Sequence, residues 1–180
     1  VNFDKSDAWY RSHFPRHSSA ARVERQTGHR AQTFESSPYY MFHPLAPQRI
    51  AEKLPDVRVL VLVRDPVERA YSAHAHELAR GYEDLDFAGA LAAEGPRLAG
   101  EVDRILADPH YESHAHRHQA YRTRGRYVEG LRALEAALGR DRIHVIDSHE
   151  FFASPEGPYD GVLDFLGLPR GPYPHFERHN

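Results

Sequence analysis

Residues 57–78, VRVLVLVRDPVERAYSAHAHEL, decide the fold class of this chain. The run of Val and Leu has no polar alternation, so it predicts a strand buried on both faces, as in parallel sheets. After it, Asp65 suits a helix N-cap, Pro66 suits the first helical turn, and Glu68 completes the spacing of a capping box. The stretch therefore predicts a buried strand followed at once by a helix.

The predicted helix has an apolar face. Val67, Ala70, Tyr71, His74 and Leu78 repeat at helical spacing, and we expect this face to pack on the sheet.

Arg64 ends the predicted strand, and Ser72 follows it by eight residues. In an open α/β sheet, ligands bind at the carboxyl edge of the strands, where the N–H groups and the dipole of a helix N-terminus favour anions. An arginine and a hydroxyl converging there indicate a phosphate site. The alternative is an ordinary Arg-Asp-Pro turn with a surface serine.

The composition sets limits on the class of protein. A chain of 180 residues can form one domain with a sizeable core. The net charge of -3 does not favour general nucleic-acid binding. The absence of cysteine excludes disulfides, thiolate metal sites and cysteine catalysis. No apolar run approaches the ~20 residues needed to cross a bilayer.

The rest of the chain predicts further α/β elements in a single domain over residues 1–180. We expect helices at residues 8–13, 47–54, 86–94, 96–106, 127–138 and 155–166, a second strand at 143–146, and a short strand at 32–35. Residues 17–33 are polar and basic and predict a surface loop, and residues 108–124 predict a loop that leads into a helix. No internal repeat or convincing domain boundary interrupts this pattern.

Four segments of the chain resemble the PAPS-dependent sulfotransferases, especially bacterial relatives of the heparan sulfate sulfotransferases. They are NFDKSDAWYRSHFP, FESSPYYMFHPLAPQRIAEKLPDVRVLVLVRDPVERAYSAH, RGRYVEGL and VLDFLGLP. The second is highly specific, because its pieces fall in the order and spacing of the family. The resemblance implies a P-loop-NTPase-like three-layer α/β domain, with a central parallel sheet flanked by helices.

The resemblance also implies residue roles. In the family, an arginine that ends a core strand and a serine eight residues later hold the 3′-phosphate of PAPS, and these positions are Arg64 and Ser72. A tyrosine that opens a later helix often completes the nucleotide pocket, and Tyr127 matches it; the alternative is a core aromatic residue. Guanidinium and hydroxyl groups suit a phosphate physically, since one offers a planar fork and the other a short, directional bond.

The chain departs from the family pattern in three places. The Gly/Ser/Thr-rich loop with a lysine that binds the 5′-phosphosulfate, and the glutamate used as base in the heparan branch, are expected before Val1. The heparan enzymes often have Glu-Lys-Thr-Pro where this chain has Glu-Ser-Ser-Pro at residues 35–38. A final cofactor-contacting loop is expected beyond Asn180. We therefore expect a domain incomplete at both ends.

Other candidate residues keep two interpretations each. Glu35 could orient the acceptor or serve as base, or it could be a hydrogen-bonded structural carboxylate. His114, His116 and His118 alternate, but the segment lacks strand signals and a helix would splay them, so we predict no metal site. The group Arg122, Arg124 and Arg126 could attract an anion or form a solvated face, and the pair Trp9 and Tyr10 could line an acceptor cleft or pack internally.

We therefore predict a cytoplasmic sulfotransferase that moves a sulfuryl group from PAPS to a hydroxyl or amine, leaving PAP. The acceptor could be a carbohydrate, which the heparan-like branch favours, a lipid or a small metabolite, and we predict no nucleic-acid partner. The main alternative is a catalytically incompetent fragment or homologue that keeps only part of the PAP/PAPS site. A weaker alternative is a nucleotide kinase-like phosphotransferase, against which the absence of GxxxxGK[ST] argues.

Overall fold

The computed structural model of the chain describes residues 5–176. Its contacts divide the chain into two compact units, Val1–Pro38 and Tyr39–Asn180, which are described separately. The prediction of a single domain over residues 1–180 stays a prediction.

In its described residues, 5–38, the first unit contains two helices, α1 (Asp7–Arg11) and α2 (His17–Thr27). Ser6 caps α1 by accepting a hydrogen bond from the Trp9 N–H at 3.1 Å. The loop predicted at residues 17–33 is wrong, since α2 fills most of it and ends at Gly28 with φ of 72°, a conformation that favours glycine. Residues 32–35 form no strand, because no neighbouring strand pairs with them among the described residues.

The second unit follows a helix–strand–helix order. It contains α3 (Ala46–Lys53), β1 (Val59–Val63), α4 (Pro66–Ala79), α5 (Phe87–Leu98), α6 (Glu101–Ala107), α7 (His114–His118), the 3₁₀ turn η1 (Thr123–Gly125), α8 (Tyr127–Leu138), the 3₁₀ turn η2 (Arg140–Arg142), β2 (Ile143–Asp147), α9 (Ser148–Ala153) and α10 (Glu156–Leu166). The helix break predicted at Gly95-Pro96 is wrong: α5 continues through Pro96 to Leu98, and the chain turns at Gly100.

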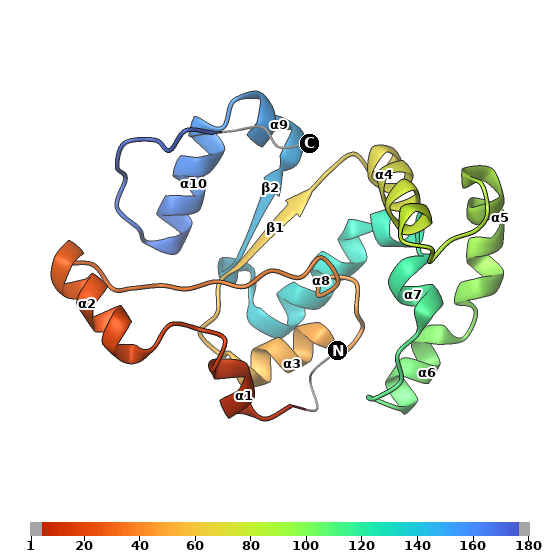
Figure 1. Cartoon of the computed structure of the whole chain (residues 1–180), viewed down its shortest axis with the longest axis horizontal. Coiled ribbons are helices and arrows are strands. Elements are labelled where there is room, and N and C mark those ends of the chain that lie inside the picture. The colour runs from red at the N-terminus through yellow and green to blue at the C-terminus, as the bar shows by residue number, and fades with distance from the viewer. Residues whose placement is uncertain (1–4, 177–180) are drawn as a thin grey trace. The chain divides into compact units, whose positions relative to one another are not determined.

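The two strands lie side by side and run parallel, with Val59 opposite Ile143 and Val63 opposite Asp147 (Figure 1). All the helices from α4 to α8 lie between them in sequence, as a parallel pairing requires a long connection. The chain is therefore an α/β protein with a parallel sheet flanked by helices, as predicted.

The main core lies on one face of this sheet. Val61 and Ile143 of the strands pack with Leu134 and Leu138 of α8, and side chains of α3 close the cluster. On the other face, the His144 ring of β2 stacks on Phe165 of α10 with ring centroids 5.2 Å apart.

The expectation that β1 is buried on both faces is wrong for the described residues. Leu60 and Leu62 are 37% and 55% exposed, while Val61 between them is 7% exposed. The physical reason is that α10 packs over β2 through His144.

Helix α4 does not pack on the sheet through the predicted face. Val67 and Tyr71 are 71% and 63% exposed, whereas Ala70 is buried and packs in a second cluster with Ala90 of α5 and with Tyr121. Helical spacing identified an apolar face correctly in part, but it carried no information about which element that face would meet. Helix α4 therefore packs with the helices α5 to α7, and only its first turn lies at the edge of the sheet.

Candidate functional site

Arg64 lies where the sequence predicts, directly after the last residue of β1 and before the N-cap of α4. Its side chain is 48% exposed. A guanidinium at the carboxyl edge of a parallel strand is available to an anion from solvent.

The N-terminus of α4 is less open than the sequence suggested. The N–H groups of Val67 and Glu68 both donate to Asp65 Oδ1 at 2.9 Å, and Pro66 has no N–H group. The N-cap predicted at Asp65 is confirmed, but the cap already uses the amide donors of the first turn. An anion at this corner must therefore be held by side chains.

Glu68 does not complete a capping box. Its Oε2 instead accepts a hydrogen bond from Arg64 Nε at 3.1 Å, an i,i+4 ion pair. The four-residue spacing between Arg64 and Glu68 was the sequence signal for this ion pair. The capping-box prediction assigned Glu68 to the helix N-terminus instead.

Ser72 lies on α4 four residues beyond Glu68 and is exposed. Residues four apart share a helix face, so Glu68 and Ser72 lie on one face of α4, while Arg64 precedes the helix and reaches this face through its bond to Glu68. Since a helix rises about 1.5 Å per residue, Ser72 is roughly 6 Å beyond Glu68 along the axis. A phosphate that contacts both Arg64 and Ser72 would take the place of the Glu68 carboxylate.

Tyr127 opens α8, and its hydroxyl donates a hydrogen bond to the main-chain carbonyl of Arg64 at 2.9 Å. The structure therefore brings together two of the predicted cofactor-binding residues, which are 63 positions apart. In this arrangement the phenol fixes the main chain of Arg64.

The three arginines of the basic segment before Tyr127 each contact a partner within the protein. Arg122 bonds the buried Glu94 through Nε at 3.3 Å, and Arg126 Nη2 lies 2.6 Å from Glu129 Oε1. The Arg124 guanidinium lies 5.4 Å from the Tyr39 ring centroid, and burial lowers its pKa. Arg122 and Arg126 are nevertheless 64% and 67% exposed, so the solvated face describes these two arginines, whereas Arg124 is partly buried.

Glu35 lies in the first unit, whereas Arg64, Ser72 and Tyr127 lie in the second. Its Oε1 accepts a hydrogen bond from the Tyr10 hydroxyl at 3.4 Å. Burial and the Glu35 charge raise the pKa of Tyr10. The role of Glu35 as base or as structural carboxylate stays a prediction.

The alternating histidines lie on α7 and have separate partners. His116 Nδ1 lies 2.7 Å from the Tyr39 hydroxyl, and burial lowers the pKa of His116 to about 4. His118 Nδ1 lies 3.1 Å from Glu77 Oε2. Within residues 5–176, no group of three or more His, Cys, Asp or Glu side chains could hold a metal ion.

The sequence interpretation missed a set of buried carboxylates around α5 and α6. Glu83, Glu94 and Glu101 are 4%, 0% and 7% exposed, and each accepts several hydrogen bonds. The sequence signal was acidic residues within apolar helical runs, such as Glu94 in FAGALAAE, although their partners could not be read from it.

No family model matches the chain. It is 26% identical over 179 residues to bifunctional heparan sulfate N-deacetylase/N-sulfotransferase 1 of Caenorhabditis elegans, covering 99% of this chain and 18% of that protein. It is 29% identical over 174 residues to human heparan sulfate glucosamine 3-O-sulfotransferase 3B1, covering 94% of this chain and 37% of that protein. The chain thus spans about a fifth to somewhat over a third of the length of these relatives.

A solved structure shows the same similarity in three dimensions. The sulfotransferase from Alicyclobacillus acidocaldarius superposes with a TM-score of 0.63 and 27% identity, over 92% of this chain and 63% of that one. Sequence and structure therefore lead to one conclusion: the chain is a distant relative of the sulfotransferases and has their P-loop-NTPase-like α/β fold.

Proposed function

We propose that this chain is part of a PAPS-dependent sulfotransferase and that it holds the 3′-phosphate of PAPS through Arg64 and Ser72. The observation that carries the proposal is the placement of Arg64 at the carboxyl edge of β1, with an exposed guanidinium that bonds Glu68, and with Ser72 exposed on α4 on the face that Glu68 shares. The relatives named above are N- and 3-O-sulfotransferases, which supports a sulfuryl donor as the ligand.

In the proposed reaction, a hydroxyl oxygen or amine nitrogen of the acceptor bonds to the sulfur of PAPS. The bond from sulfur to the phosphate oxygen breaks, PAP leaves with that electron pair, and the acceptor's proton passes to a base. Arg64 and Ser72 would fix the nucleotide at its 3′-phosphate, distant from the transferred group. Tyr127 would hold the main chain of Arg64 in place, and Glu35 is the candidate base within the described residues.

A carbohydrate is the proposed acceptor, since the relatives carry heparan sulfate in their names. A lipid or a small metabolite would need the same chemistry at the transferred group. No helix within residues 5–176 is long and apolar enough to cross a membrane. The cytoplasmic location stays a prediction.

The second candidate function is nucleotide binding without transfer. The observation that favours it is the Ser36-Ser37 pair, which stands where the heparan enzymes often carry a lysine near the sulfuryl group. Such a homologue would bind PAP through Arg64 and Ser72 and would leave PAPS intact.

Titration calorimetry with PAP tests nucleotide binding, which both candidate functions require. Arg64→Ala should weaken PAP binding by about 10- to 100-fold, since charge-assisted hydrogen bonds contribute about 1.5–3 kcal/mol. The control Arg132→Ala removes an exposed arginine of α8 and should leave PAP affinity unchanged. Equal PAP affinity in the two variants, or competition by ATP as strong as by PAP, would contradict the 3′-phosphate assignment. An assay of sulfuryl transfer from PAPS to an acceptor amine or hydroxyl then distinguishes the transferase from a protein that only binds the nucleotide.

A further inference from the structure

Residues 121–127 form a segment that lies against the first half of α4, and it is called here the α4 strap. At its start, the Arg69 guanidinium donates a hydrogen bond to the Tyr121 carbonyl. In its middle, Gly125 approaches Pro66 so closely that an added Cβ would lie 3.0 Å from Pro66 Cβ. The strap therefore contacts the helix that carries Ser72.

The end of the α4 strap reaches the candidate phosphate site itself. Tyr127 is its last residue, and its hydroxyl bonds the Arg64 carbonyl at 2.9 Å. A displacement of the strap would move this hydrogen bond, and with it the main chain from which the Arg64 side chain projects.

Glu94 of α5 holds the α4 strap at Arg122 and Thr123. Its Oε2 accepts hydrogen bonds from the Arg122 N–H at 2.9 Å and from Arg122 Nε at 3.3 Å, and its Oε1 accepts from the Thr123 N–H at 2.8 Å. Both carboxylate oxygens therefore accept hydrogen bonds from Arg122 and Thr123, the strap residues at the start of the turn η1.

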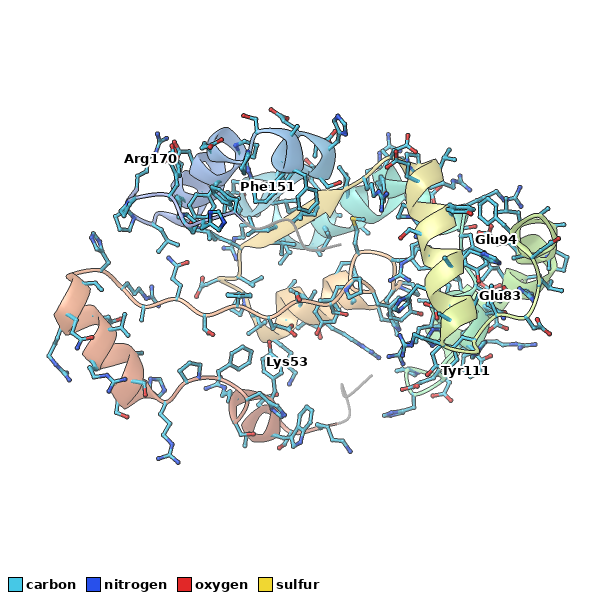
Figure 2. The ribbon with its side chains drawn as sticks, turned by 45° about the horizontal axis from the view of Figure 1, so that its top comes forward. Lys53, Glu83, Glu94, Tyr111, Phe151 and Arg170 are labelled. Atoms are coloured by element: carbon cyan, nitrogen blue, oxygen red, sulfur yellow. The ribbon has the colours of Figure 1, made fainter. Side chains whose placement is uncertain are left out.

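Glu94 is 0% exposed, and Figure 2 shows it among the helices beside α4. Burial raises the pKa of Glu94, but the N–H groups of Thr123 and Arg122 outweigh that effect and leave the pKa below its ordinary value. A buried carboxylate that remains charged strengthens each of these hydrogen bonds.

We propose that Glu94 is a positioning residue of the nucleotide site: by anchoring Arg122 and Thr123 it fixes Tyr127, and through Tyr127 it fixes Arg64 for the 3′-phosphate. This proposal rests on the proposed function, because it too takes the 3′-phosphate of the nucleotide as the ligand of Arg64. Glu94 itself does not touch the nucleotide; its effect travels through the α4 strap.

Glu94→Gln tests this role with little change of shape. Since both oxygens of Glu94 accept bonds from donors, the amide of glutamine would turn an NH₂ group toward either Thr123 N–H or Arg122 N–H. That end of the strap would lose its anchor. Glu94→Asp keeps the charge on a shorter side chain, so it should retain one of the two anchors and give an intermediate effect.

A matched control is Glu101→Gln on α6. Glu101 is also buried, at 7% exposed, and accepts hydrogen bonds from the Tyr111 hydroxyl at 2.9 Å and Arg104 Nη1 at 2.9 Å. Its hydrogen-bond partners Arg104, Tyr111 and Ser113 all lie outside residues 121–127, so its loss reports general destabilisation of the buried carboxylates without release of the strap.

The first measurement is the affinity ratio of PAP to AMP, which differ only in the 3′-phosphate. Glu94→Gln should lower this ratio about 5- to 10-fold, close to the cost of one lost hydrogen bond at Arg64, with Glu94→Asp between it and the wild type. Glu101→Gln should keep the wild-type ratio even where its melting temperature falls. An unchanged ratio in Glu94→Gln, or an equal loss in Glu101→Gln, would overturn the proposal.

The second measurement is hydrogen exchange without nucleotide, which keeps the test independent of the proposed function. Glu94→Gln should speed amide exchange in peptides covering residues 121–127 and 64–69, and Glu101→Gln should leave both as in the wild type. If the wild-type chain does not bind PAP but exchange follows this pattern, the proposed function fails and the link from Glu94 to Arg64 stands. If exchange rises at residues 121–127 alone, the link to Arg64 is wrong.

Discussion

Arg64 and Glu68 form an ion pair at 3.1 Å between Nε and Oε2, which joins the carboxyl edge of β1 to the first turn of α4. The pair matters because the same guanidinium is the proposed ligand of the 3′-phosphate. Its side chains are 48% and 63% exposed, so solvent weakens their attraction and a dianionic phosphate can displace Glu68.

Glu68→Gln should therefore raise PAP affinity by about 1.5- to 5-fold, the factor that corresponds to an exposed ion pair of about 0.2–1 kcal/mol. The gain should shrink as salt is added, since salt screens exposed charges. Calorimetric titration with PAP measures it. Glu52→Gln, an exposed carboxylate of α3, is the control for the change in net charge. An affinity that stays constant or falls would mean that Glu68 does not compete for Arg64.

Ser72→Ala should weaken PAP binding by about 5- to 10-fold, since a single hydroxyl hydrogen bond contributes about 1 kcal/mol. AMP affinity should stay at the wild-type value, because AMP lacks the 3′-phosphate. The exposed position of Ser72 means that the variant should fold normally. A loss of equal size for AMP would place Ser72 outside the 3′-phosphate contacts.

Tyr127→Phe removes the hydroxyl bond to the Arg64 carbonyl at 2.9 Å and keeps the ring. We expect a 2- to 10-fold weaker affinity for PAP, about 0.5–1.5 kcal/mol for one neutral hydrogen bond. Combined with Arg64→Ala, the change should add almost nothing, because the phenol acts through Arg64. A double-mutant cycle by calorimetry measures this, and full additivity would show that Tyr127 contacts the nucleotide by another route.

The pH dependence of stability should follow Glu83, a buried carboxylate of the second unit labelled in Figure 2. Its Oε2 accepts from Arg97 Nη1 at 2.7 Å and from the Tyr121 hydroxyl at 2.9 Å. Burial raises the pKa of Glu83, but Arg97 and the main-chain N–H groups of Leu85 and Asp84 outweigh it and hold the pKa at about 2. A carboxyl whose pKa is lower when folded stabilises the fold at pH values above its unfolded pKa of 4.5.

That stabilisation should be lost as the pH falls from about 4.5 to about 2. Glu83→Gln should lower the free energy of unfolding at pH 7 by about 1.5–3 kcal/mol, the range for hydrogen bonds to a charged group, and should flatten the acid loss. Urea unfolding at pH 7, 4.5 and 3 measures both effects. Asp84→Asn changes a neighbouring carboxylate whose side chain is 90% exposed and should leave the curve nearly unchanged. A variant with the wild-type acid profile would contradict the role of Glu83.

Gly130 of α8 is required by a close approach to the segment before α3. A Cβ at Gly130 would lie 2.4 Å from the Met41 carbonyl oxygen. Gly130→Ala should therefore cost about 1–3 kcal/mol of unfolding free energy through overpacking. Gly157→Ala in α10, where no atom lies within 4 Å of the added Cβ, should be neutral or slightly stabilising. Thermal unfolding compares the two, and equal melting temperatures would contradict the close approach.

Local signals predicted the elements around the candidate site well. The strand before Arg64, the N-cap at Asp65 and the helix that Tyr127 opens all agree with the structure. Each depends on residues within a few positions of one another, so sequence spacing contains the necessary information.

Local spacing did not predict contacts between residues that are far apart in the sequence. The apolar spacing of α4 did not reveal that Ala70 packs against Ala90 while Tyr71 stays exposed, because the period of a helix does not specify its neighbour. Glu94 likewise appeared only as an acidic residue in an alanine-rich helix, since its partners Arg122 and Thr123 lie 28 and 29 residues later.

The sequence by itself determined the α/β class, the strand–helix corner that carries Arg64 and Ser72, and the likeness to sulfotransferases, because these reside in local order and spacing. Only the tertiary structure decided what each side chain at the corner does. It assigned the Asp65 carboxylate to the free amides of α4, Glu68 to Arg64, and Tyr127 to the Arg64 carbonyl. Hydrogen bonds depend on distance and direction between atoms, and packing alone brings residues 63 positions apart to within 2.9 Å.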